Sequence, residues 1–185
     1  LKKRSISQIA DRRTAIVEAL QARGATLRVI NGGGTGSMES TRAEPHVTEI
    51  TVGSGFYSPT LFDNYQAFKH QPAAGFAIEI VRQPKPDTYT CLGGGYIASG
   101  GIGADKQPSI YAPYGATLTD LEGAGEAQTP VVYSGNETLN LGDPIFMRHG
   151  KAGELCERFN TLLQVHEGQI INEVPTYRGE NQCFL

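Results

Sequence analysis

Residues 29–37 read Val29-Ile30-Asn31-Gly32-Gly33-Gly34-Thr35-Gly36-Ser37, and a short apolar run from Leu27 to Ile30 leads directly into the glycines. The apolar run predicts a buried strand over residues 26–30. Glycines let the backbone turn sharply and bring its N–H groups close to a ligand, and successive N–H donors in such a turn form a concavity that binds anions. We therefore predict a phosphate-binding loop after the strand, with a plain flexible turn as the alternative. It is not a P-loop, because no lysine follows the glycines.

A helix is predicted immediately before this strand, over residues 5–23. Ser5 and Gln8 have the spacing of a capping box, and Gly24 supplies a helix stop. Isoleucines and a leucine recur on one face at helical spacing, at Ile6, Ile9, Ile16 and Leu20. Helix, turn, strand and glycine loop form one α/β unit, with the loop where parallel α/β folds place their ligands. One such unit cannot make a parallel sheet, so we expect the others on a preceding portion or on another chain.

The pattern changes at about residue 46 and favours an antiparallel β domain. Short β-type runs are separated by Gly, Pro, Asn and Asp turn signals. The predicted strands are 47–52, 76–81, 88–92, 129–133, 143–147, 162–165 and 170–174. Residues 166–169 are predicted to form the hairpin turn between the last two strands. The expected division is therefore residues 1–45 for the α/β unit and 46–185 for the β domain.

Composition excludes several classes of protein. The 185 residues carry a formal net charge of −3, which gives no reason to expect nucleic acid or a membrane surface as partner. No apolar run approaches the roughly 20 residues that cross a bilayer. Three cysteines without Cys-x-x-Cys spacing favour a reducing, cytoplasmic compartment. Because the chain begins at Leu1 without Met, we expect it to be the tail of a longer protein.

Several motifs, in this order and spacing, resemble the C-terminal part of fold-type III pyridoxal-phosphate (PLP) enzymes. The branch with the greatest likeness contains D-threonine aldolase, D-serine dehydratase and the amino-acid deaminase/aldolase relatives, with an alanine-racemase-like fold. The motifs are residues 31–37, 48–57, 62–63, 91–99, 125–129, 142–143, 148–155 and 176–180. The resemblance covers essentially the whole chain.

The resemblance implies an α/β remnant of a (β/α)₈ alanine-racemase-like barrel, followed by a mainly antiparallel β domain. The cofactor would be PLP, with its phosphate held by Gly32, Gly33, Gly34, Thr35 and Gly36. The Schiff-base lysine of the family lies on the first barrel strand, and no lysine of this chain matches it. We therefore expect this chain alone to be inactive, and the missing N-terminal barrel portion to be a required partner.

The resemblance also marks three residues for the reaction. Tyr57 matches an aromatic residue near the cofactor, where a phenol can orient substrate or relay a proton; a half-buried strand tyrosine is the alternative. His149 matches the first ligand of a His-x-Cys or His-x-Asp pair that binds a divalent cation in the metal-activated branch. The third position is Lys151 here, which departs from the pattern because an ammonium has no free lone pair. We hypothesise that Lys151 supplies a fixed positive charge instead, against a solvated basic patch as the alternative.

The implied function is that of a PLP-dependent lyase acting on D-β-hydroxy-amino acids, by D-threonine aldolase or D-serine dehydratase chemistry. An amino-acid racemase of the same fold is a second hypothesis, and a non-catalytic anion-binding fragment is a third. Family relatives are homodimers, so a homodimer and a small D-amino acid substrate are the expected partners.

Overall fold

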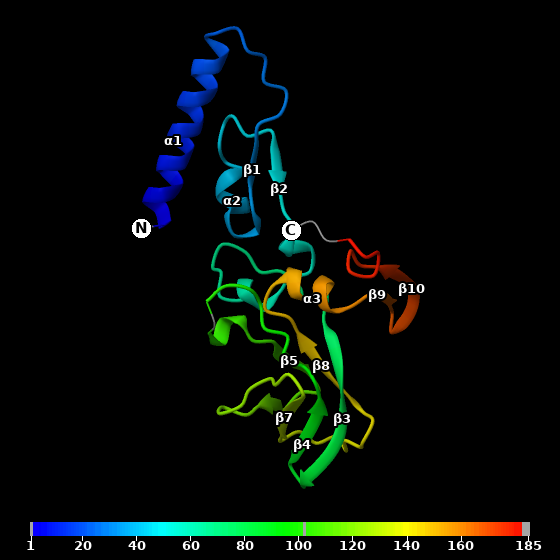
Figure 1. Cartoon of the computed structure of the whole chain (residues 1–185). Coiled ribbons are helices and arrows are strands. Elements are labelled where there is room, and N and C mark those ends of the chain that lie inside the picture. Colours follow the sequence, from blue (N-terminus) through cyan, green and yellow to red (C-terminus); the bar gives the residue numbers. More distant parts are fainter. Residues whose placement is uncertain (1, 102, 183–185) are drawn as a thin grey trace. The chain divides into compact units, whose positions relative to one another are not determined.

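The computed structural model describes residues 2–101 and 103–182, which fall into two compact units (Figure 1). The first unit comprises Leu1–Phe56 and Asn64–His70, and the second comprises Tyr57–Asp63 and Gln71–Leu185. We expected the second region to begin at residue 46, but residues 46–56 are part of the first unit. Among the described residues, no helix is long and apolar enough to cross a membrane.

The first unit begins with helix α1, Lys2–Gln21, and continues through short elements. These are strand β1 (Asn31–Gly33), a 3₁₀ turn (Thr35–Ser37), helix α2 (Met38–Thr41), strand β2 (Glu49–Thr51) and a second 3₁₀ turn (Ser54–Phe56). Because α1 begins before Ser5, the predicted capping box there is wrong. The predicted stop is confirmed: Gly24 has a φ of 83°, and the amides of Arg23 and Ala25 donate to the Leu20 carbonyl.

The glycines themselves form the strand of this unit. β1 pairs in parallel with β2, with Gly32 opposite Ile50. The predicted strand over residues 26–30 is wrong, because the strand begins at Asn31, just after the predicted range. Ile30 lies outside the ladder, and its amide donates to Thr48 Oγ1 at 2.9 Å. The predicted strand 47–52 is present in shortened form as β2.

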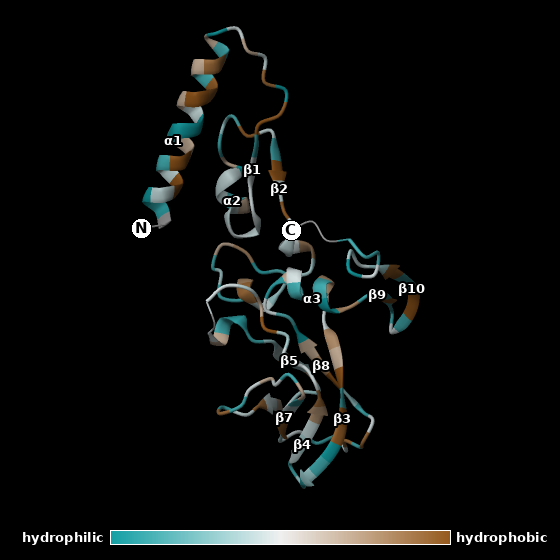
Figure 2. Ribbon diagram, viewed as in Figure 1, coloured by the Kyte–Doolittle hydropathy of each residue, from teal (hydrophilic) through white to brown (hydrophobic). Residues whose placement is uncertain are grey.

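The apolar face of α1 is largely uncovered. Val17 is buried, but Ile9 and Ile16 remain 52% and 61% exposed. Hydrophobic residues recur along the helix in Figure 2. This face and residues 27–31 line a cavity of about 450 Å³. The first unit therefore presents an apolar surface that its own residues do not bury.

The second unit is built on a six-stranded antiparallel sheet. Its strands are β3 (Phe76–Lys85), β4 (Thr88–Leu92), β5 (Ser109–Ala112), β6 (Ala116–Leu118), β7 (Gln128–Tyr133) and β8 (Pro144–Arg148), in the order β5-β8-β3-β4-β7-β6. The edge strands β5 and β6 lie close together, so the sheet is nearly closed. The predicted strands 76–81, 88–92, 129–133 and 143–147 are confirmed as β3, β4, β7 and β8. The sequence pattern missed β5 and β6.

The remaining elements of the second unit flank this sheet. They are two 3₁₀ turns (Thr60–Phe62 and Ala104–Lys106), helix α3 (Ala152–Arg158), and strands β9 (Thr161–His166) and β10 (Gln169–Pro175). β9 and β10 form the predicted antiparallel hairpin, which turns through Glu167 and Gly168, both with positive φ. Leu163, Val165 and Ile170 are more than half exposed on this hairpin.

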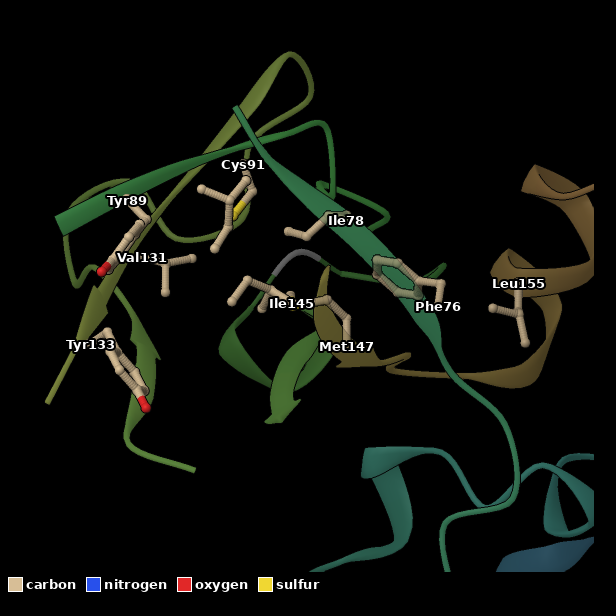
Figure 3. Close-up of a cluster of buried hydrophobic side chains, with 10 residues drawn as sticks. Phe76, Ile78, Tyr89, Cys91, Val131, Tyr133, Ile145, Met147 and Leu155 are labelled. Carbon is tan, nitrogen blue, oxygen red and sulfur yellow. The ribbon is translucent and has the colours of Figure 1, made fainter. Parts of the chain in front are cut away.

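The core of the second unit lies inside the nearly closed sheet (Figure 3). Side chains from four central strands and from α3 converge there: Phe76, Ile78, Ile80, Tyr89, Cys91, Val131, Tyr133, Ile145, Met147 and Leu155. Alternate residues of each strand point inward, as expected for a sheet that buries one face. Burial of this apolar surface is the main stabilising contribution to the unit.

Candidate active site

The glycine segment forms a tight bend at the end of β1. Gly33 and Gly34 both have a φ of 118°, a conformation that side chains rarely adopt. A Cβ at Gly33 would lie 2.9 Å from Ile50 Cγ2, and one at Gly32 would lie 2.9 Å from Thr41 Cγ2. The Gly34 amide donates to the Thr51 carbonyl at 2.9 Å, which closes the bend onto β2. Glycine is therefore required here by both conformation and space.

Two amide donors remain free in this bend. The hydrogen bonds among the described residues do not use the Thr35 or Gly36 amide, which lie at the start of the 3₁₀ turn, where N–H groups lack helical partners. Thr35 Oγ1 accepts from the Gly55 amide at 2.9 Å and keeps its own proton for donation. Ser37 Oγ already donates to the Gly34 carbonyl at 3.3 Å. This donor set fits a small anion such as a phosphate group.

In the second unit, the turn between β8 and α3 carries residues 148–151. Arg148 binds the Asp63 carboxylate through two hydrogen bonds of 2.7 and 2.9 Å and donates to the Ser58 carbonyl at 2.9 Å. The Thr60 and Leu61 amides donate to the carbonyls of His149 and Gly150. Residues 58–63 therefore hold the first three residues of this turn, 148–150. A bidentate arginine–carboxylate pair also fixes the direction of the turn.

His149 is fully buried in this turn. Neither ring nitrogen makes a well-formed hydrogen bond within the described residues, although the backbone at Ala74 lies near enough to favour the protonated ring slightly. Burial, and then the charge of Arg148, lower the pKa of His149 from 6.5 to about 4. The imidazole is therefore neutral at neutral pH, with a lone pair available.

Tyr57 packs edge-on against His149, with ring centroids 6.2 Å apart. Its phenol oxygen lies 3.7 Å from Cys156 Sγ on α3. The pKa of Tyr57 is raised, first by this hydrogen bond with Cys156 and then by burial. The structure thus brings together two residues singled out from the sequence, with the phenol protonated at neutral pH, and adds Cys156 as their neighbour.

Lys151 and Glu154 complete the turn. Lys151 Nζ donates to the Ser99 carbonyl at 2.8 Å, and the Lys151 amide donates to Glu154 Oε1 at 2.6 Å. Glu154 is buried, its Oε2 has no partner among the described residues, and burial raises the pKa of its carboxyl group. Glu154 thus caps the first turn of α3. The Lys151 side chain cannot accept a hydrogen bond from the Glu154 amide in return, because an ammonium only donates.

Sequence reasoning missed the residues that shape this turn. The bidentate partner Asp63 lies 85 positions before Arg148 and gives no local signal. Glu154 falls within the motif 148–155, but its cap was not predicted, because it pairs with a lysine and not with the Ser or Thr of a capping box. Gly150 is required because a Cβ there would lie 2.9 Å from the Lys106 carbonyl oxygen.

The donor set around His149 does not fit a divalent cation. A neutral imidazole can serve as one ligand, but Lys151 offers no second one. Within residues 2–101 and 103–182, no group of three His, Cys, Asp or Glu side chains is arranged to hold a metal ion.

Comparison with known proteins links the chain to solved structures only. No model of a protein family matches it, and no curated protein matches its sequence. Its fold is similar to D-threonine aldolase from Filomicrobium marinum, with a TM-score of 0.77 at 15% identity, over 94% of this chain and 48% of that one. It is also similar to D-threo-3-hydroxyaspartate dehydratase from Delftia sp. HT23, with a TM-score of 0.68 at 16% identity, over 94% of this chain and 51% of that one. The chain therefore spans about half the length of the solved structures that it matches.

Two variants of that dehydratase also match. In one, at 18% identity and a TM-score of 0.63, a histidine is replaced by alanine; the alignment covers 86% of this chain and 46% of that one. In the other, at 16% identity and a TM-score of 0.68, a cysteine two positions later is replaced, and the protein is in the metal-free form; the alignment covers 94% of this chain and 51% of that one. These identities are low, so the likeness establishes the fold.

Proposed function

We propose that this chain is the C-terminal portion of a PLP-dependent lyase acting on D-β-hydroxy-amino acids, of the D-threonine aldolase or D-serine dehydratase type. The observation that carries the proposal is the fold match to an aldolase and a dehydratase over nearly the whole chain. The glycine bend supports it, because its free amides suit a phosphate group. The proposal includes a preceding barrel portion that carries the anchoring lysine, since the chain spans about half of those relatives.

The residues of the first unit would hold the cofactor phosphate. The Thr35 and Gly36 amides and the Thr35 hydroxyl would donate to it, while Gly32, Gly33 and Gly34 keep the bend free of side chains. Bound PLP takes up the electrons released when a bond to Cα or Cβ breaks. The fixed donors of the bend orient the cofactor without reorganising during the reaction.

Tyr57 would orient the substrate. Its raised pKa keeps the phenol protonated at neutral pH, so it can donate a hydrogen bond to a substrate oxygen. The edge contact with His149 limits where the ring can turn. The proposal also includes a homodimer. It places the protein in a reducing, cytoplasmic compartment, which suits three cysteines without a Cys-x-x-Cys pair.

Binding of the cofactor phosphate by the glycine bend is tested in the longer polypeptide with a pair of glycine variants. Gly34 and Gly24 both have positive φ, and a Cβ would meet no atom closer than 4.0 Å at either. Both changes should strain the backbone, and Gly34→Ala more than Gly24→Ala, because the φ of 118° and ψ of 148° at Gly34 are open essentially to glycine alone. Only Gly34→Ala should weaken PLP binding, measured by the visible absorbance of the bound cofactor during titration. Equal PLP affinity in both variants would contradict the role of the bend.

The reaction is identified from products. D-threonine should give glycine and acetaldehyde if the protein is an aldolase, and D-serine should give pyruvate and ammonia if it is a dehydratase. Loss of optical rotation from an amino acid without either set of products would favour the racemase instead. A longer polypeptide that binds no PLP would leave only an anion-binding module.

A further inference from the structure

The resemblance stated above matches His149 to the first residue of a His-x-Cys or His-x-Asp metal-binding pair, and two of the similar dehydratase structures are variants at a histidine and at the cysteine two positions later. Replacement of a cysteine two positions after a histidine accompanies a metal-free form in that enzyme. In this chain the residue two positions after His149 is Lys151. We propose that no divalent cation binds beside His149, and that the Lys151 ammonium supplies positive charge there in its place. The second half of this inference rests on the function proposed above.

The charges around Lys151 support the exclusion of a cation. Lys106 lies near Lys151, since a Cβ at Gly100 would lie 3.4 Å from Lys106 Cε and 3.8 Å from Lys151 Nζ. Arg148 belongs to the same turn as Lys151. Arg148 is paired with Asp63 and Lys106 with Asp105. Among the described residues, Lys151 has no carboxylate within salt-bridge distance. Asp105 and Glu154 act on the Lys151 charge from a longer distance, without pairing with it. An ammonium that no carboxylate contacts repels a divalent ion and favours an anion.

The carboxylates of the turn do not replace the missing ligand. Asp63 and Asp105 are occupied by their cationic partners. Glu154 accepts from the Lys151 amide through Oε1, and only its Oε2 is unpartnered. The Cys156 thiol contacts the Tyr57 hydroxyl instead. Among the described residues no three His, Cys, Asp or Glu side chains are arranged to hold a metal ion, whereas protein zinc sites use three or four ligands.

Lys151 is held in place by its hydrogen bond to Ser99, which uses one of its three protons. Two protons remain to stabilise negative charge on the β-oxygen of a substrate, as alkoxide in an aldol cleavage or as departing hydroxide in a dehydration. A metal ion would stabilise the same charge in a metal-activated enzyme.

The test measures metal content, which does not depend on PLP or on activity. The wild-type chain is incubated with Zn²⁺ or Mn²⁺, gel-filtered and analysed by elemental mass spectrometry. We expect no retained ion in the wild type and one per chain in Lys151→Cys and in Lys151→Asp. The added ion should disappear when His149→Ala is combined with either change. Lys85→Cys, at the far end of β3, controls for metal binding by an added thiol.

Two results would overturn the inference. One is a retained ion in the wild type that His149→Ala or Glu154→Gln removes. The other is a pair of folded Lys151→Cys and Lys151→Asp variants that stay metal-free, because Lys151 would then not be what excludes the ion. Circular dichroism establishes that both variants are folded.

The catalytic half is tested in the longer polypeptide. Lys151→Gln should lower kcat about 100-fold with little change in KM, as for loss of an oxyanion donor, while Lys151→Arg should retain most of the activity. Wild-type activity should resist chelators.

Absence of bound PLP in the longer polypeptide would remove the proposed function and leave the metal result standing. A His149-dependent ion with normal PLP binding would remove only this inference. An unchanged kcat in Lys151→Gln would refute the role of the ammonium.

Discussion

The two units of the chain bury their hydrophobic residues very differently. The second unit closes a six-stranded sheet around ten buried side chains, while in the first unit Val17 is buried and the neighbouring Ile16 is 61% exposed. The described part of the first unit pairs two strands, which cannot bury a layer of side chains by themselves. The second unit therefore has a complete core of its own, whereas the first has the surface of an element that packs against something else.

The same substitution placed in each unit gives the largest expected effect. Ile145→Ala should lower the free energy of unfolding by about 2–5 kcal/mol, because it leaves a cavity in the core of the second unit. Ile16→Ala should change it by no more than about 0.5 kcal/mol, since that side chain is already mostly exposed. Urea denaturation followed by circular dichroism measures both. An equal loss in the two variants would break the comparison and show that α1 is buried in solution.

The acid sensitivity of the second unit should depend on His149. Its pKa is about 4 in the folded state against 6.5 unfolded, so the unfolded chain binds a proton that the folded chain does not. Its contribution is complete above about pH 6.5, is lost as the pH falls toward 4, and amounts to about 3 kcal/mol. His149→Gln should flatten the stability curve over this window. The exposed His166→Gln is the control, and an unchanged curve in His149→Gln would contradict the burial of the ring.

Two glycines three residues apart, Gly150 and Gly153, test how tightly the turn between β8 and α3 is packed. Gly150→Ala should destabilise the second unit by about 1–3 kcal/mol, because its Cβ would press against the Lys106 carbonyl oxygen and Ala98 Cβ. Gly153→Ala lies in α3 with no atom within 4 Å of a Cβ, so it should be neutral or stabilise by up to about 1 kcal/mol. Thermal unfolding of both variants decides the matter. Equal melting temperatures would show that the turn is looser than described.

The smallest effect is expected at Arg148. Arg148→Lys keeps the charge but loses the two-pronged contact with Asp63, and should lower stability by about 1 kcal/mol. Arg42→Lys, in an exposed pair with Glu39 of the first unit, should change stability very little. A double-mutant cycle with Asp63→Asn isolates the pair. A coupling energy near zero would show that residues 58–63 do not hold the turn through this contact.

The sequence predicted the second unit better than the first, for a physical reason. β3, β7 and β8 alternate buried and more exposed residues, and this period can be read from a window of a few residues. β4 is a short β-type run with three consecutive buried residues. β5 and β6 escaped because each spans only three or four residues and is held by its neighbours across the sheet. In the first unit, β1 consists of Asn31 and two glycines, a composition that propensity assigns to a loop. Its strand conformation comes from pairing with β2, which is 18 positions away.

In the candidate site too, residues with a local sequence signal could be predicted and residues brought in by distant segments could not. The glycines, Tyr57, His149 and Lys151 could be selected because their residue types and spacing carry chemical meaning. Their partners could not: Asp63, Ser58 and Ser99 meet the turn only through the folding of distant segments. Burial of His149 could not be predicted either, since a histidine between an arginine and a glycine has no apolar flank in the sequence.

The β9–β10 hairpin has a consequence for anyone who purifies this chain. Among the residues that the structure describes, its two strands pair only with each other, and Leu163, Val165 and Ile170 are exposed beside unpaired backbone edges. Such edges recruit further strands from neighbouring molecules. We expect concentrated preparations to aggregate through this hairpin. Val165→Lys should prevent the aggregation, so that the solution stays clear.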